Sequence, residues 1–431
     1  MEVFVYEHVS SGGYAGRKLP AWLAEGYSML AAFLEDFKRL GCKTVTLLDA
    51  RLKPEGLKAD RVRFVKSSLE VEGLIEDFAS KADATLIIAP EHGGILPRLL
   101  RLAERAGSAT LNAPSSLLEG LGKAEILERL KVEGVSMPEA LTLDSPEDLR
   151  LKAWKSFPAV VKPSLGVGCL GLTLIRNPSQ LGKAVEYAWK ASPSKILVQK
   201  FVEGLHGSVS LLANGSQARI LSVNLQLVRL SERPEASEYL GGLTPLSLWN
   251  PEALSFEALK ACRALGGLKG FVGVDFVEAD GKPWIIEVNP RPSTSYLGLR
   301  KVLRVNPACL LLEACLEGRL PEDLEVRGFS AYFKNGFQPS DGSLEVFSPG
   351  EGKALVVGWD ESLEALLLRV EEFEVGRLLS SALKASPLQR LRRLEERLRA
   401  KGVNYRLIKL KGKAITSADV VKQAAGSVKP D

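Results

Sequence analysis

The sequence VDFVEADGKPWIIEVNPRPST, residues 274–294, is the stretch that decides the fold. Apolar residues flank Asp275, a short segment rich in Asp and Gly follows, and Trp284–Ile286 begin a second apolar run. Two apolar runs joined by such a turn predict a β-hairpin. Side chains two residues apart on a strand point to the same side, about 6.5 Å apart, so Glu287 and Asn289 share one face. The hairpin can place Asp275 beside them.

Two carboxylates and an amide oxygen are therefore expected at one place. Mg²⁺ prefers hard oxygen ligands and completes its octahedron with water and phosphate oxygens. The next residues, Pro290, Arg291 and Pro292, add a rigid turn with a fixed cation beside the acids. We interpret the hairpin as a magnesium site, and the alternative is a hairpin whose charges are only solvated.

Size and charge limit the class of protein. The chain has 431 residues, 45% hydrophobic and 25% charged, which is typical of a globular protein with two to four sub-domains. Its net charge of +5, from 57 basic and 52 acidic residues, is too small to indicate nucleic acid as the partner. We therefore expect small-molecule substrates.

Cysteine and histidine usage indicates the compartment. The five cysteines are scattered without a C-x-x-C pair, which argues against a disulfide framework and predicts the reducing cytoplasm. Three histidines are too few for a His-based zinc site. Residues 1–7 carry acids and no basic segment before an apolar run, so we expect no secretory signal. No apolar stretch reaches membrane-spanning length, and no membrane partner is expected.

The first third of the chain alternates apolar strands with helical segments such as 22–40. The predicted strands are Val3–Tyr6, Thr44–Leu48, Arg61–Val65 and Thr85–Ile88. This rhythm predicts a parallel sheet, in which ligands bind beyond the carboxyl ends of the strands. Loops 7–13 and 90–94, which follow the first and fourth strands, are candidate substrate loops. Their Gly and Ser residues are equally typical of ordinary turns.

From about residue 113 the pattern becomes α+β, with a helix that carries Lys123 and then short strands and hairpins to about residue 325. The strands expected there are 159–162, 172–175 and 196–202. The C-terminal part has β-like runs at 331–333 and 355–357 and an amphipathic helix at 387–401. Between Lys384 and Lys413 there are eleven basic residues and two acids, a solvated helix face or, alternatively, a polyanion site. We predict domains at 1–112, 113–327 and 328–431.

Residues 166–171, GVGCLG, satisfy the G-x-G-x-x-G pattern of dinucleotide folds. That fingerprint must lead from a strand into a helix, whereas here the strand-like 172–175 follows, which excludes a Rossmann fold and an NAD oxidoreductase. We predict a hairpin loop that covers a triphosphate with its backbone N–H groups. Lys162, at the end of the preceding strand, would reach the phosphates. A surface lysine is the alternative for Lys162 alone.

Two further segments fit a nucleotide. Lys123 lies at a helix start, where the helix dipole disfavours a cation unless an anion is also present, which indicates phosphate; an ordinary solvated lysine is the alternative. Residues 198–204 read as a strand that enters a linker, apolar enough to enclose an adenine ring, although the same pattern also suits a core strand.

The motifs occur in an order that resembles the ATP-grasp ligases over roughly residues 1–325. The resemblance implies an α/β and α+β protein: an ATP-grasp fold, a parallel-sheet pre-ATP-grasp domain before it and a C-terminal extension after it. It assigns two Mg²⁺, or Mn²⁺ as a substitute, to Asp275, Glu287 and Asn289, and gives catalytic roles to Arg291, as the acyl-phosphate contact, and Lys162. The ATP-binding residues that it implies are Lys123, Lys162, Gly166, Gly168, Gly171, Gln199, Lys200, Phe201, Val202 and His206. The sequence departs from the family pattern at Gly122, where an acid is usual, and at His206, where many members carry a ribose-binding acid.

Within the superfamily, the loops at 7–13 and 90–91 and the segments at 224–226, 241–242 and 289–296 resemble the tyramine–L-glutamate ligase group of methanofuran biosynthesis. The implied reaction activates glutamate with ATP and joins it to an aromatic amine through an amide. Substrate residues are then expected in the loops, on the strand at 224–226 and after the hairpin: Glu7, His8, Ser11, Gly12, Gly13, Glu91, Gln226, Ser293 and Thr294. A different acid and amine pair, a carboxylating enzyme of the same fold and a non-catalytic ATP-binding sensor or scaffold remain alternatives. A homodimer is one assembly state compatible with these expectations.

Overall fold

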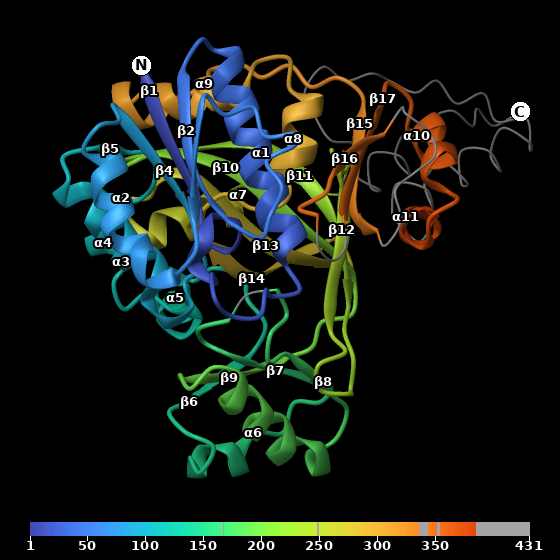
Figure 1. The fold of residues 1–431 in the computed structure, drawn as a ribbon. Coiled ribbons are helices and arrows are strands. Elements are labelled where there is room, and N and C mark those ends of the chain that lie inside the picture. Colours follow the sequence, from blue (N-terminus) through green and yellow to red (C-terminus); the bar gives the residue numbers. More distant parts are fainter. Residues whose placement is uncertain (167, 248–249, 336–343, 351–353, 385–431) are drawn as a thin grey trace, which may run out of the picture.

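The computed structural model describes residues 1–166, 168–247, 250–335, 344–350 and 354–384. Three β-sheets organise this part of the chain (Figure 1). The helix expected at 387–401 and almost all of the basic segment from Lys384 to Lys413 lie outside the described residues.

The N-terminal sheet is parallel and has the strand order β3-β2-β1-β4-β5. Its strands are β1 (Glu2–Glu7), β2 (Lys43–Asp49), β3 (Arg61–Val65), β4 (Ala84–Ile88) and β5 (Ala109–Thr110). The helices of this part are α1 (Leu23–Arg39), α2 (Val71–Ala79), α3 (Ile95–Arg105) and α4 (Ser115–Leu118). The predicted βαβ pattern is confirmed, because each of the four expected strands lies within a residue of the observed bounds.

Alternation along β1 explains why both faces of this sheet are covered. Val3 and Val5 pack into the core that contains α1, whereas Phe4 and Tyr6 pack into the core that contains α2 and α3. Strand β1 lies in the middle of the sheet, where it pairs with β2 on one side and with β4 on the other. The strand order therefore changes direction at β1. The loops after β1 and β4 therefore lie side by side at the carboxyl edge, the position where open α/β sheets bind ligands.

The second sheet is a small antiparallel sheet that projects as a separate lobe in Figure 1, with the order β6-β9-β7-β8. Its strands are β6 (Ala140–Leu143), β9 (Ile196–Lys200), β7 (Ala159–Pro163) and β8 (Thr173–Ile175). Helix α6 (Leu181–Ala191) packs on one face, and α5 (Lys123–Val132) precedes the lobe in sequence. The glycine segment at 166–171 joins β7 to β8, which confirms the predicted hairpin and the absence of a strand-to-helix turn there.

The third sheet has eight strands in the order β14-β13-β10-β11-β12-β15-β17-β16. Its strands are β10 (Leu205–Asn214), β11 (Ala218–Arg229), β12 (Glu238–Thr244), β13 (Lys269–Ala279), β14 (Lys282–Asn289), β15 (Phe329–Asn335), β16 (Glu345–Phe347) and β17 (Ala354–Asp360). The remaining helices are α7 (Pro251–Leu265), α8 (Tyr296–Val302), α9 (Pro307–Leu312), α10 (Leu363–Val370) and α11 (Glu374–Lys384). Strands β15, β17 and β16 continue this sheet beyond β12, so the first part of the predicted C-terminal extension is built into the central sheet.

Candidate active site

The hairpin of β13 and β14 brings the three predicted metal ligands together. Asp275 pairs directly with Glu287, and Gly273 pairs with Asn289, so the three side chains share one face. The Nδ2 of Asn289 donates to Oδ2 of Asp275 over 3.1 Å, and the Nε2 of Gln226 donates to Oδ1 of the same carboxylate over 2.9 Å. A register shift between Asp275 and Phe276 gives β14 one extra residue, which is consistent with a β-bulge beside the site.

The donor set fits Mg²⁺. Burial and the charge of Glu287 raise the pKa of Asp275, although hydrogen bonds from Gln226 and Asn289 oppose this rise. A cation beside the two carboxylates would relieve their repulsion. Among the described residues no cluster of three His, Cys, Asp or Glu side chains could hold a metal. A metal on Asp275, Glu287 and Asn289 would therefore need further oxygens from phosphate or water, as Mg²⁺ usually does.

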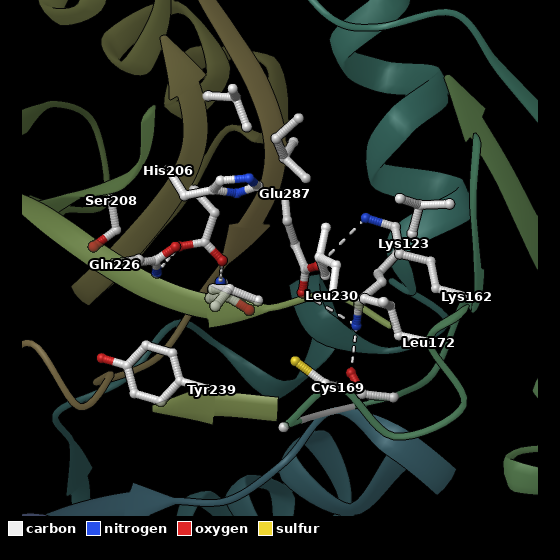
Figure 2. A pocket seen from close by; sticks show the side chains of 18 of the residues that line it. Lys123, Lys162, Cys169, Leu172, His206, Ser208, Gln226, Leu230, Tyr239 and Glu287 are labelled. Atoms are coloured by element: carbon white, nitrogen blue, oxygen red, sulfur yellow. Dashed lines mark hydrogen bonds and ion pairs between the residues drawn. The ribbon is translucent and has the colours of Figure 1, made fainter. Parts of the chain in front are cut away.

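Lys123 and Lys162 both face Glu287 (Figure 2). The Nζ of Lys123 lies 3.1 Å from Oε1 of Glu287, and the Nζ of Lys162 lies 3.7 Å from Oε2. Burial opposes ionisation of Glu287, but the two lysine charges outweigh it and lower its pKa. Lys123 is the first residue of α5, and the anion beside it in this structure is Glu287. A triphosphate would find two cations already held in place.

The glycine segment forms one wall of the same cavity. Gly168 and Gly171 have φ of 60° and 72°, and Cys169 takes φ of 65°, a left-handed conformation uncommon for a residue with a side chain. The carbonyl of Gly166 accepts a hydrogen bond from the Nζ of Lys123. Gly171 does not line the cavity, and a Cβ there would lie 2.9 Å from Ala191 and Pro163, so packing accounts for this glycine.

The predicted adenine segment follows β9. The N–H groups of Lys200 and Phe201 donate to the carbonyls of Glu139 and Pro158 over 2.8 and 2.9 Å. The N–H of Val202 has no such partner in the part of the chain that the structure describes, and it is free to read a base edge. Apolar side chains on strands β7 and β14 and in the segments next to β8, β9 and β11 also line the cavity: Val160, Leu172, Phe201, Leu230 and Ile286. Burial lowers the pKa of His206, which favours a neutral imidazole.

These groups line one cavity of 260 Å³ at the junction of the sheets. The structure brings most of the predicted residues to its wall: Lys123, Lys162, Gly166, Gly168, Gln199, Lys200, Phe201, Val202, His206, Gln226, Asp275, Glu287, Asn289, Arg291, Ser293 and Thr294. Gln226, predicted as a substrate contact, donates to the Asp275 carboxylate.

The N-terminal loop residues lie elsewhere. Glu7 lines a smaller neighbouring cavity. His8, Ser11, Gly12 and Gly13 line neither cavity, because they form a tight buried turn: a Cβ on Gly12 would lie 2.6 Å from Val65, and the Oγ of Ser11 accepts the N–H of Glu7 over 3.3 Å.

Arg291 links two parts of the chain. Its Nε lies 2.8 Å from Oε1 of Glu91, in the loop after β4, and both side chains are 17% exposed. Glu91 therefore reaches the site through Arg291 and does not line the large cavity itself. Ser293 Oγ lies 2.8 Å from Ser295 Oγ, which in turn lies 3.0 Å from Ser210 Oγ, so the segment after Arg291 is anchored on β10.

Sequence reasoning missed Glu25 and Tyr239. Both line the large cavity, Glu25 from α1 and Tyr239 from β12. Neither residue belongs to a recognisable motif, and Glu25 reads in sequence as one acid on an amphipathic helix. Only the tertiary structure, which brings α1 and β12 to the same cavity as the hairpin, reveals them.

Comparison with known proteins agrees with this geometry. Residues 122–295 match the family model of the ATP-grasp domain, and residues 42–116 match that of the pre-ATP-grasp domain. A tyramine–L-glutamate ligase from Methanocaldococcus jannaschii is 25% identical over 332 residues, which are 75% of this chain and 91% of that protein.

Solved structures show the same fold. An ATP-grasp superfamily protein from Archaeoglobus fulgidus superposes with a TM-score of 0.60 and 24% identity, over 84% of this chain and all of that one. An L-amino acid ligase from Bacillus licheniformis gives 0.63 and 17%, over 86% and 96% of the two chains. None of the helices in the described ranges has the length and apolar character needed to cross a bilayer.

Proposed function

We propose that this enzyme, which combines a pre-ATP-grasp domain with an ATP-grasp domain, is an ATP-dependent carboxylate–amine ligase. The observation that carries the proposal is the pairing of Lys123 and Lys162 with Glu287 across a cavity that also holds Asp275 and Arg291. The paired lysines suit the phosphate oxygens of ATP, and the paired carboxylates suit a metal bound to those phosphates. Arg291 adds a cation where a substrate anion would be activated.

The first half-reaction transfers a phosphoryl group. A carboxylate oxygen of the substrate attacks the γ-phosphorus of ATP, and ADP leaves. Lys123, Lys162 and the N–H groups of the glycine segment hold the phosphates, so the protein contributes positioning and charge neutralisation. Mg²⁺ on Asp275, Glu287 and Asn289 would neutralise phosphate charge.

The second half-reaction forms the amide. The amine nitrogen attacks the acyl carbon, the bond to the phosphate oxygen breaks, and phosphate leaves with its electron pair. Arg291 stabilises the acyl phosphate, and the amine loses a proton to a neighbouring base or to water.

We propose L-glutamate as the acid and tyramine as the amine, which the name of the M. jannaschii relative supports. We also propose two Mg²⁺, replaceable by Mn²⁺, a cytoplasmic location, a role in methanofuran biosynthesis and, as an assembly state, a homodimer. ADP release measured across amino acids paired with amines tests the substrates. Turnover by another pair but none by glutamate with tyramine would overturn the narrow proposal and leave the ligase.

Glu287→Gln tests the site itself. The change removes the carboxylate shared by both lysines and the metal, and we expect amine-dependent ADP release to fall at least about 100-fold. Glu76→Gln, at an exposed position on α2, is the matched control. Full activity of Glu287→Gln would remove the metal and phosphate assignment, and the melting temperature of each variant reports whether it is folded.

A further inference from the structure

The smaller cavity, which Glu7 lines, is a second cavity at the carboxyl edge of the N-terminal sheet. It opens beside the 260 Å³ cavity proposed to bind ATP, which we call the nucleotide cavity. The two cavities share Glu25, Gly168, Arg291 and Thr294 as lining residues. They therefore meet next to Arg291, where the proposed function forms the acyl phosphate. Most of the remaining wall of the second cavity is apolar: Val9, Trp22, Met29, Ile88, Ala89 and Pro90.

Three acids lie near this junction, and two of them are not available to a ligand in the two cavities. Oε1 of Glu7 accepts the N–H of Val9 over 3.1 Å, and its Oε2 accepts the N–H and Oγ of Ser10 over 2.8 and 2.6 Å. Glu7 also packs against α1, because a Cβ on Gly26 would lie 2.5 Å from its carboxyl carbon. Glu91 is paired with Arg291 through Oε1, and it lines neither of the two cavities. These two carboxylates hold the protein's own parts together.

Glu25 differs from both. Its Oε1 lies 2.7 Å from the Nζ of Lys334 on β15, with the two side chains 12% and 13% exposed. Its Oε2 receives no hydrogen bond from any residue in the described ranges. This oxygen is also not fully shielded from solvent. Burial raises the pKa of Glu25, while the Lys334 charge beside it favours the ionised form. One oxygen is thus held by the protein, and the other remains available.

We infer that Oε2 of Glu25 binds the protonated amino group of a substrate and makes Glu25 a specificity-determining residue. The inference rests on the proposed function, since it identifies which end of a substrate the second cavity receives. A buried carboxylate is stabilised most by a donor that is itself a cation, and the apolar wall suits the carbon skeleton attached to that donor. Two sources of a primary ammonium are compatible with this chemistry: the amine substrate, whose body the wall with Trp22 and Met29 favours, and the α-ammonium of the amino acid.

Binding experiments that need no turnover test the inference. Calorimetric titrations in the presence of Mg²⁺ and a non-hydrolysable ATP analogue compare tyramine with 4-ethylphenol, and L-glutamate with glutarate; each second ligand lacks only the amino group. We expect the wild type to prefer one ammonium ligand over its counterpart without the amino group by about 10- to 100-fold, the range of a charge-assisted hydrogen bond. Glu25→Gln should abolish that preference, while Glu76→Gln on exposed α2 should retain it.

The identity of the affected pair gives the source: loss for tyramine alone identifies the amine, and loss for glutamate alone identifies the amino acid. Glu25→Gln leaves Lys334 without its partner, so the double variant Glu25→Gln with Lys334→Met, which removes both charges, is the second test and should lose the same preference. Unchanged affinity for the ATP analogue shows that each variant is folded.

An ammonium preference that survives in Glu25→Gln, or that is absent from the wild type, overturns the inference. The two proposals fail separately. Absence of ADP release with every acid and amine pair, combined with a preference that depends on Glu25, would remove the ligase and leave the binding site. Normal ligase activity with an ammonium preference independent of Glu25 would remove the proposed role of Glu25 and leave the ligase.

Discussion

At the scale of single residues, the contact of Glu91 with Arg291 connects the loop after β4 to the segment after β14. The 2.8 Å pair fixes the guanidinium at the junction of the two cavities, where both side chains are mostly buried. Glu91 does not line the nucleotide cavity. Its influence on the reaction should therefore pass through the position of Arg291.

We predict that Glu91→Gln lowers the turnover number for ADP release about 10-fold, equivalent to about 1.4 kcal/mol of transition-state stabilisation. The apparent affinity for ATP should stay within about twofold, because the proposed phosphate-binding residues Lys123 and Lys162 are untouched. Steady-state kinetics at saturating acid and amine measure both quantities. An equal loss of ATP affinity, or an unchanged turnover number, would contradict a positioning role.

At the scale of elements, β12 can enter the central sheet only because it carries glycine where the backbones crowd. A Cβ on Gly242 would lie 2.5 Å from the carbonyl oxygen of Leu225 and 2.6 Å from the hydroxyl of Tyr332. We predict that Gly242→Ala lowers the free energy of unfolding by about 2 kcal/mol or more, because the crowded backbone cannot yield easily. Gly73 in α2 has open space around it, so Gly73→Ala should instead stabilise by up to about 1 kcal/mol. Urea unfolding of both variants measures the contrast, and equal effects would refute it.

Asp60 ties α1, β2 and the start of β3 together, and it gives this edge a pH dependence. Hydrogen bonds from Lys38 and then from the N–H of Thr44 lower the pKa of Asp60 to about 2. Since the unfolded value is about 3.9, Asp60 contributes stability that is fully present above about pH 4 and is lost as the pH falls towards 2. After allowance for solvent screening, Asp60→Asn should cost about 1 kcal/mol at pH 7. The difference from wild type in urea unfolding should shrink between pH 4 and pH 2.5, and a constant difference would contradict this account.

At the scale of the whole molecule, one buried ionic cluster joins the N-terminal sheet to the ATP-grasp part. Arg300 on α8 is 2% exposed and donates to Asp36 on α1 through Nε and Nη2 over 2.8 and 2.7 Å. Tyr296 adds a 2.7 Å hydrogen bond to the same carboxylate, and its ring stacks on Phe33. This cluster sets the relation between α1, which carries Glu25, and the hairpin that carries Asp275, Glu287 and Asn289.

We predict that Arg300→Met lowers the free energy of unfolding by about 3–5 kcal/mol, because Asp36 is left buried without its counter-ion. The double variant with Asp36→Asn should recover part of the loss, since neither charge then remains. Chemical denaturation of the single and double variants measures the coupling. Strictly additive effects would show that the two residues do not act as a pair.

The hairpin and the glycine segment could be predicted from the sequence because each depends on residues that are close in sequence. The alternation around Asp275 and Glu287 predicted the hairpin, and the strand-like residues after Gly171 excluded a Rossmann turn; the structure confirms both elements. The strand expected at 196–202 ends at Lys200, because the N–H of Phe201 pairs with Pro158 beyond the strand pairing of β9.

Other features were decided by contacts between distant segments. The sequence at 331–333 indicated a strand, but its place beside β12 depends on the pairing of Gly241 with Phe333. Loop 7–13 was predicted to hold substrate because it follows a strand of the parallel sheet and resembles a family loop. In the structure it forms a turn in which Glu7 is the one predicted residue that lines either of the two cavities. The same residue types serve turns and sites, so composition alone could not separate the two.

The sequence by itself determined the chemistry of this protein: two lysines, a glycine hairpin and a carboxylate hairpin arranged in the order of an ATP-grasp domain. These are short-range patterns of strand, turn and charge, and they depend only on residues that are close in sequence. Tertiary structure alone decided which carboxylates are free. Glu7, Glu25 and Glu91 look alike in sequence. Only the tertiary packing occupies both oxygens of Glu7, keeps Glu91 out of the two cavities and leaves one oxygen of Glu25 without a hydrogen bond at their junction.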